Sequence, residues 1–103
     1  MRTPQELERG LAAPETLGLN SRVEIREAAK HLLAELPTGT GRLVIDLSAT
    51  RTIDSAGLGA LMLIQRMAAE RRQTVALRAP SEEIRFLLVL TKLADLFDID
   101  DAP

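Results

Sequence analysis

Cysteine is absent from this chain of 103 residues, and so are tryptophan and tyrosine. The lack of cysteine excludes disulfides, thiol chemistry and cysteine-ligated zinc. Phe86, Phe97 and the single histidine, His31, carry all of its aromatic rings, which argues against a surface that stacks nucleic-acid bases. A formal net charge of -2 provides no overall field to attract nucleic acid or an anionic membrane. We therefore expect no cofactor, no metal and no nucleic-acid partner.

Long hydrophobic runs are also missing. The strongly apolar stretches are interrupted within about ten residues, which is too short to cross a bilayer, and the polar start of the chain contains Glu6 and Glu8 rather than a signal region. These features predict a soluble, cytoplasmic protein without direct membrane insertion. The length predicts a single domain over residues 1–103, with residues 1–7 flexible and residues 100–103 forming an acidic, solvated tail.

The spacing of apolar residues predicts alternating strands and helices. Pro14 and Gly18 leave only short edge strands near the start, and a capping box between Ser21 and Glu24 is expected to open the first helix. The elements expected after Gly18 are a helix ending before Pro37, a buried strand over 43–47, a helix over 56–72, a strand over 74–79, a helix opened by Ser81 and a short strand over 97–99. Such alternation indicates an α/β fold with parallel pairings.

The residues between the second strand and the second helix carry the chemistry of this chain. Asp54, Ser55, Ala56 and Gly57 stand at the start of that helix, where a serine is a favoured N-cap. The small residues allow a second backbone or a partner to approach closely. The open amides of a helix start favour an anion, so a phosphate on Ser55 would be tolerated without unfolding the helix.

The runs V-I-D-L-S and I-D-S-A-G-L-G-A-L, from Val44 to Leu61, resemble the signature of the STAS family, named for sulfate transporters and anti-sigma factor antagonists. The later stretch 75–99 is similar as well, so the resemblance extends over roughly residues 19–99. It implies a STAS-like single domain: a mixed four- to five-stranded sheet with three to four helices packed on it. The N-terminal strand region is shortened, and Leu19-Asn20 stands where relatives have Leu-Asp.

The resemblance also assigns roles to residues. In the family, the serine after the motif aspartate is phosphorylated by a partner kinase, and this role carries over to Ser55, which follows Asp54. The alternative for Ser55 is a plain helix cap. Asp54 is most simply a cap that complements the helix dipole, and Asp46 is most simply a carboxylate bound to nearby amides in support of the loop.

Leu58 and Met62 follow Ser55 on a helix with apolar residues around most of its circumference. One sheet cannot cover all of them, so we expect these two side chains to contribute to a docking face, together with Asp54, Ala56 and Gly57.

The resemblance implies an anti-sigma factor antagonist rather than an enzyme. The unphosphorylated protein would bind an anti-sigma factor with serine kinase activity and would be released on phosphorylation of Ser55. A phosphatase and a weak homodimer are further partner hypotheses. The alternative is an accessory subunit of a membrane lipid-transport ABC ATPase complex, because single-domain STAS proteins of that type share the D-S-A-G-L-x-x-L run.

Overall fold

The computed structural model describes residues 7–101, in which strands and helices alternate. The segment 1–7, expected to be flexible, lies outside the described residues except for Leu7, as do the last two residues of the expected tail. None of the described helices combines the length and the apolar character needed to span a membrane. In chain order the elements are β1 (Glu8–Ala12), β2 (Thr16–Leu17), α2 (Arg22–Glu35), β3 (Arg42–Asp46), β4 (Thr52–Ile53), α3 (Ser55–Glu70), β5 (Thr74–Arg78), α4 (Glu82–Leu90), the 3-10 helix η1 (Leu93–Leu96) and β6 (Asp98–Asp100).

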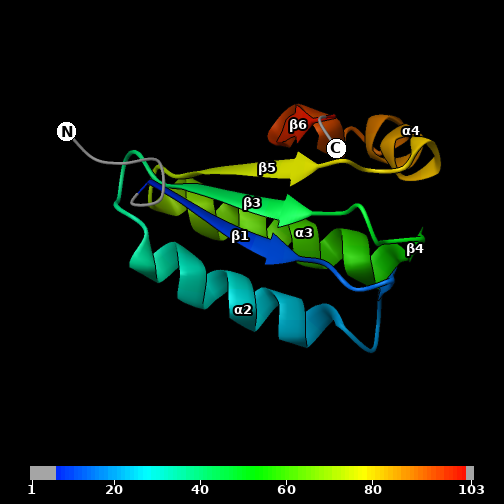
Figure 1. The fold of residues 1–103 in the computed structure, drawn as a ribbon, viewed down its shortest axis with the longest axis horizontal. Helices are drawn as coiled ribbons and strands as arrows, with labels where there is room; N and C mark the ends of the chain where they lie inside the picture. The colour runs from blue at the N-terminus through cyan, green and yellow to red at the C-terminus, as the bar shows by residue number, and fades with distance from the viewer. Residues whose placement is uncertain (1–6, 102–103) are drawn as a thin grey trace.

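The main sheet has four strands in the order β1-β3-β5-β6, and β2 pairs with β4 in a second sheet of two strands (Figure 1). Every pairing among the described residues is parallel, so the mixed sheet expected from the sequence is not found over this range. The reason is that a helix separates each pair of neighbouring strands in the main sheet, and such a crossover returns the chain in the same direction. The α/β fold itself is confirmed.

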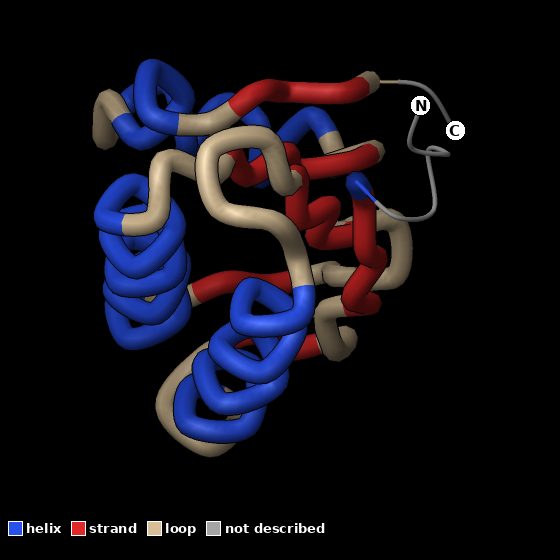
Figure 2. The backbone as a smooth tube through the Cα atoms, turned by 90° about the vertical axis from the view of Figure 1, so that its left-hand side faces the viewer, coloured by secondary structure: helices blue, strands red, loops and turns tan. Residues whose placement is uncertain are grey.

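One face of the sheet forms the core. Helices α2 and α3 lie side by side on this face (Figures 1 and 2). The sheet contributes alternate residues, with Leu43 and Ile45 of β3 registered against Val75 and Leu77 of β5, and all four are buried. One stripe of α3, at helical spacing, is buried against this face and consists of Gly57, Leu61, Ile64 and Ala68.

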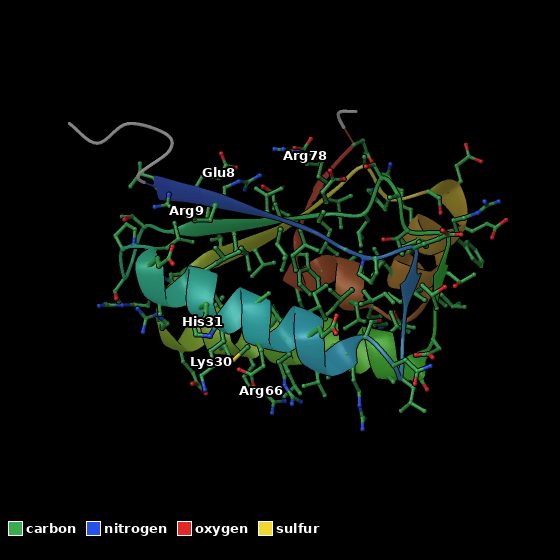
Figure 3. All side chains as sticks on the ribbon, turned by 60° about the horizontal axis from the view of Figure 1, so that its bottom comes forward. Glu8, Arg9, Lys30, His31, Arg66 and Arg78 are labelled. Carbon is green, nitrogen blue, oxygen red and sulfur yellow. The ribbon has the colours of Figure 1, made fainter. Side chains whose placement is uncertain are left out.

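The opposite face of the sheet carries charged residues (Figure 3). Arg42 forms ion pairs with Glu8 on β1 and with Asp98 on β6. The acidic end of the chain continues this pattern, because Arg78 pairs with Asp100 at 3.1 Å and Arg85 with Asp101 at 2.6 Å. The expectation of a solvated acidic tail is therefore wrong for Asp100, which belongs to β6, whereas Asp101 is exposed and pairs with Arg85.

The start of α2 differs from the expected capping box. The Ser21 hydroxyl makes no cap hydrogen bond to α2; it donates to the Thr16 carbonyl at 2.9 Å and accepts from the Gly18 amide at 3.0 Å. A serine side chain can satisfy nearby backbone groups of a turn instead of a helix end, and that alternative prevails here. The expected cap of α4 is confirmed, because the Ser81 hydroxyl accepts from the Ile84 amide at 3.2 Å.

Candidate functional site

The candidate site lies where the chain leaves β3 and enters α3. A loop over residues 48–51 follows the buried Leu47, and β4 then pairs with β2 before the helix begins. The Thr50 hydroxyl donates to the Pro14 carbonyl at 2.8 Å, which joins this loop to the segment after β1. The start of α3 consequently lies at the same end of the molecule as the start of α2 (Figure 1). Ligands of open α/β sheets bind at this end, beyond the carboxyl ends of the strands.

Asp54 is the N-cap of α3. Its Oδ1 accepts from the Gly57 amide at 2.9 Å, and its Oδ2 accepts from the Leu19 amide at 3.3 Å. The backbone amide of Asp54 donates in turn to the Leu17 carbonyl. These hydrogen bonds to the ionised carboxylate, that of Gly57 above all, lower the pKa of Asp54. The capping interpretation of Asp54 is thus confirmed, and the alternative that Ser55 is the cap is wrong.

Ser55 is the first residue of α3 and is exposed. Its hydroxyl makes no hydrogen bond with any residue in the described range, because the neighbouring Asp54 occupies the capping position. The positive charge of Arg22, at the start of α2, acts on Asp54 and so lies close to this helix end. An exposed, uncommitted hydroxyl at a helix start can accept a phosphate without disturbing the cap.

Gly57 allows the backbone of β2 to lie close to the start of α3. A Cβ at this position would lie 2.1 Å from the Leu17 carbonyl oxygen, so only glycine allows β2 to pass so close to α3. Of the two alternatives expected for the small residues, a second backbone or a partner, the structure shows the first at Gly57, where the approaching backbone is the protein's own. A Cβ at Gly59 would meet no atom within 4 Å. Ala56 is half-buried.

The two side chains expected to dock a partner differ in exposure. Met62 is 42% exposed, whereas Leu58 is half-buried and packs against the core. Sequence reasoning missed two exposed residues at this end of the molecule, Leu19 and Val23. Leu19 adjoins the site through its amide bond to Asp54. The helical spacing contained the signal for Val23, because this residue lies off the buried stripe of α2, which consists of Ile25, Ala29 and Leu33.

Asp46 ends β3 and does not join Ser55. Its Oδ1 accepts from the Ser48 amide at 2.8 Å. This bond to Ser48, with a further contribution from the charge of Arg78, lowers the pKa of Asp46. Side chains alternate along a strand, so Asp46 points to the charged face of the sheet, away from α3. The expectation that this carboxylate binds nearby amides is confirmed.

His31, the single histidine, is not brought to Ser55. His31 lies on α2 (Figure 3), about 13 Å along the helix axis from Arg22 at a rise of 1.5 Å per residue, whereas Ser55 opens α3 near the start of α2. The described part of the chain contains no group of three or more histidine or carboxylate side chains that could hold a metal ion. A groove does lie nearby, between the loop after β3 and the start of α4, and it is lined by Ser48, Thr50, Arg51, Thr52, Ser81, Glu82 and Glu83.

Solved structures with a similar fold come from regulatory proteins. A protein of Thermotoga maritima described as a candidate anti-sigma factor antagonist superposes with a TM-score of 0.78 and 24% identity, over 92% of this chain and 80% of that one. The anti-sigma factor antagonist SpoIIAA, in its unphosphorylated form, superposes with a TM-score of 0.71 and 16% identity, over 100% of this chain and 86% of that one. At these identities the likeness establishes the fold.

The family is established by sequence as well. A family model described as "Mlab, STAS domain" matches residues 10–98, a range that includes β3, Asp54, Ser55 and the whole of α3. The chain belongs to the STAS domain family.

Proposed function

We propose that this protein is an anti-sigma factor antagonist whose binding is switched by phosphorylation of Ser55. The observation that carries the proposal is the exposed hydroxyl of Ser55, which is left uncommitted because Asp54 caps the helix. The fold shared with two structures of proteins described as anti-sigma factor antagonists supports it. One of those structures is of an unphosphorylated form, which suggests the same modification here. This role would place the protein in the cytoplasm, where sigma factors act, and would require no catalysis by the protein itself.

The partner is an anti-sigma factor with serine kinase activity. It would bind the unphosphorylated protein over an apolar surface next to Ser55, to which the exposed side chains Leu19, Val23 and Met62 belong. The kinase would then transfer the γ-phosphoryl group of ATP to the Ser55 oxygen, with loss of the hydroxyl proton and release of ADP. A phosphatase would hydrolyse the phosphate and restore binding.

Phosphorylation would break this contact through charge. A phosphoserine carries a charge of about −1.5 to −2 at neutral pH, and burying it against an apolar partner without a counter-charge costs several kcal/mol of desolvation. Arg22 carries a single positive charge, which cannot neutralise both the Asp54 carboxylate and a phosphate of about −2. The fold would persist, because a negative charge on the first residue of a helix complements the helix dipole. Release would therefore leave a folded protein ready for reuse.

The test is retention of partners from a host lysate on wild-type, Ser55→Ala and Ser55→Asp baits, identified by mass spectrometry. We expect a nucleotide-binding kinase to be retained by wild type and Ser55→Ala and to be lost with Ser55→Asp. The matched control is Ser81→Asp, which adds the same charge at the exposed N-cap of α4, where aspartate caps as well as serine. Equal retention by Ser55→Ala and Ser55→Asp would exclude the switch, and loss with Ser81→Asp would reduce it to a general charge effect.

A second candidate function is that of an accessory subunit of a membrane lipid-transport ABC ATPase complex. It is favoured by the structural roles of the D-S-A-G-L run: Asp54 caps α3 and Gly57 admits the backbone of β2, so the fold alone accounts for these residues. In this case the same baits would retain a transporter ATPase irrespective of the residue at position 55. Deletion of the protein would then impair assembly of the ATPase complex.

A further inference from the structure

Two hydrogen bonds place the backbone of Arg22 beside the start of α3. The Leu19 amide donates to Oδ2 of Asp54 at 3.3 Å, and the Arg22 amide donates to the Gly18 carbonyl at 2.8 Å. Gly18 lies against the same carboxylate, because a Cβ on this glycine would be 2.3 Å from Oδ2 of Asp54. Arg22 is the first residue of α2, so α2 begins close to the N-cap of α3 (Figure 1).

The guanidinium of Arg22 is uncommitted. Arg22 is exposed, and within residues 7–101 its side chain forms neither an ion pair nor a hydrogen bond, although its charge acts on Asp54. Three other arginines, in contrast, each hold a carboxylate: Arg42, Arg78 and Arg85. The Arg22 side chain is therefore available to a further anion at this end of the molecule.

A phosphate on Ser55 would be such an anion. Ser55 directly follows Asp54 and is exposed, so the phosphate would stand beside an ionised carboxylate. Like charges raise the pKa of an acid, and the second pKa of a phosphoserine is already about 6. Without a cation close by, part of the second negative charge of the phosphate would be lost near neutral pH.

The other ionisable groups at this end of the molecule do not supply that cation. Glu15 and Arg51 precede β2 and β4, and Glu24 and Arg26 lie in the first turns of α2. These four residues are two acids and two bases, so their formal charges cancel. Arg22 is the cation that remains.

We propose that Arg22 binds the phosphate of phosphorylated Ser55; this inference rests on the phosphorylation proposed above. A guanidinium can pair with a phosphate through two parallel N–H···O bonds. Such a pair would hold the phosphate in its doubly charged form at neutral pH and so strengthen the release of the partner. It would also carry the effect to α2, because Arg22 precedes the exposed Val23 of the proposed contact surface.

The test is a phosphorus NMR titration of the full chain with phosphoserine incorporated at position 55 during translation, which requires no kinase. We expect Arg22→Ala to raise the second pKa of the phosphate by about half a pH unit. Arg22→Lys should keep most of the wild-type value, because it keeps the charge. The matched control is Lys30→Ala, at an exposed cation on α2 about 12 Å along the helix axis from Arg22, and it should leave the phosphate pKa unchanged.

Thermal melts provide a second readout. Serine and phosphoserine at position 55, each combined with the native Arg22 and with Arg22→Ala, form a double-mutant cycle. Any effect of Arg22→Ala on α2 itself is common to both forms of position 55 and cancels. We expect phosphoserine to be better tolerated when Arg22 is present, and this coupling should vanish in 1 M salt.

Three results would overturn the proposal: an unchanged phosphate pKa in Arg22→Ala, an equal shift in Lys30→Ala, or a cycle without coupling. Arg22→Gln replaces Arg22→Ala in both measurements if the alanine variant does not fold. The proposed switch fails separately, since retention of the kinase by a Ser55→Asp bait would exclude the switch, whereas the titration would still measure the contact between Arg22 and the phosphate.

Discussion

At the scale of single residues, Asp54 joins two segments that are distant in the sequence. Its carboxylate accepts from the amides of Gly57 and Leu19, and its own amide donates to the Leu17 carbonyl. One side chain thus connects the start of α3 with the segment that leads into α2. Because Asp54 caps the helix, the Ser55 hydroxyl has no hydrogen bond with a described residue. The proposed phosphorylation of Ser55 therefore depends on the capping role of Asp54.

Replacement of Asp54 should reveal this role through pH. Asp54→Ala removes the cap and should lower the midpoint of thermal unfolding at neutral pH. Asp54→Asn keeps an acceptor and should remain close to wild type there. Because folding lowers the pKa of Asp54 below its ordinary 3.8, the ionised carboxylate stabilises the fold above that value, and this contribution disappears as the pH falls through the lowered pKa. Thermal melts from pH 7 down to pH 2 should thus show a smaller loss for Asp54→Asn than for wild type. Identical losses would contradict the assignment.

Gly57 and Gly59 provide a matched pair on the same helix. Gly57→Ala places a Cβ 2.1 Å from the Leu17 carbonyl oxygen, so either β2 or α3 must move, at a cost of about 1–3 kcal/mol. Gly59→Ala meets open space and should increase the free energy of unfolding by about 1 kcal/mol through helix propensity. Urea denaturation measures both changes, and a stable Gly57→Ala would show that the close approach is not required.

At the scale of elements, the end of α2 depends on a residue that is remote in sequence. The buried side chain of Gln73, which precedes β5, donates through Nε2 to the carbonyls of Leu33, Leu36 and Pro37 at 2.9, 3.0 and 3.3 Å. These carbonyls belong to the end of α2 and the turn after it. The Leu36 amide also donates to the Leu33 carbonyl and the Gly41 amide to the Pro37 carbonyl, so Gln73 adds to the backbone donors there. A glutamine about forty positions away therefore helps to end this helix.

Truncation of Gln73 should destabilise the protein through α2. Gln73→Ala leaves the carbonyls of Leu33 and Leu36 without this donor and should cost about 1–3 kcal/mol. Gln65→Ala is the control, because Gln65 on α3 is half-buried and has no side-chain hydrogen bond with a described residue; we expect a change within about 0.5 kcal/mol. Amide hydrogen exchange should also show faster opening of the last turn of α2 in Gln73→Ala. Equal effects of the two substitutions would refute the capping role.

Local sequence patterns predicted some helix caps correctly and others wrongly. Ser81 was a correct prediction, since the residues that follow a serine N-cap supply the amide that it accepts. Ser21 was a wrong prediction, because its hydroxyl binds Thr16 and Gly18 in the preceding turn. The alternative that Ser55 is a cap failed for a related reason, because the adjacent Asp54 carboxylate accepts from the Gly57 amide instead. A sequence pattern identifies side chains that could cap a helix. The folded backbone around them decides which hydrogen bonds form.

At the scale of the whole molecule, Arg42 ties one edge of the sheet to the other. It lies on β3 and pairs with Glu8 on β1 and with Asp98 on β6, reaching across β5. The hydrogen bond to Asp98 and the charges of both carboxylates raise the pKa of Arg42 above its ordinary value. The last strand is short, so side-chain pairing supplements its backbone contacts.

Removal of Arg42 should loosen this connection in a salt-dependent way. Arg42→Ala should reduce the free energy of unfolding by about 0.5–1 kcal/mol at low ionic strength, and the difference from wild type should shrink in 1 M salt because screening weakens the wild-type pairs. Arg66→Ala is the control, since Arg66 is exposed on α3 (Figure 3) and forms no ion pair within residues 7–101. Guanidinium chloride is itself a salt, so urea is the appropriate denaturant. An unchanged difference in high salt would contradict an electrostatic origin.

The sequence by itself determined the α/β class, the parallel crossovers and the buried stripe of α3, and it singled out Ser55 as the candidate residue for modification. All of these depend on apolar spacing or on a contiguous motif. Only the tertiary structure decided that Asp54 rather than Ser55 caps α3, that Gly57 admits the backbone of β2, and that the acidic end pairs with Arg42, Arg78 and Arg85. The physical reason is that each of these contacts joins segments far apart in sequence or depends on competition between neighbouring groups. Their outcome is fixed only once the chain has packed.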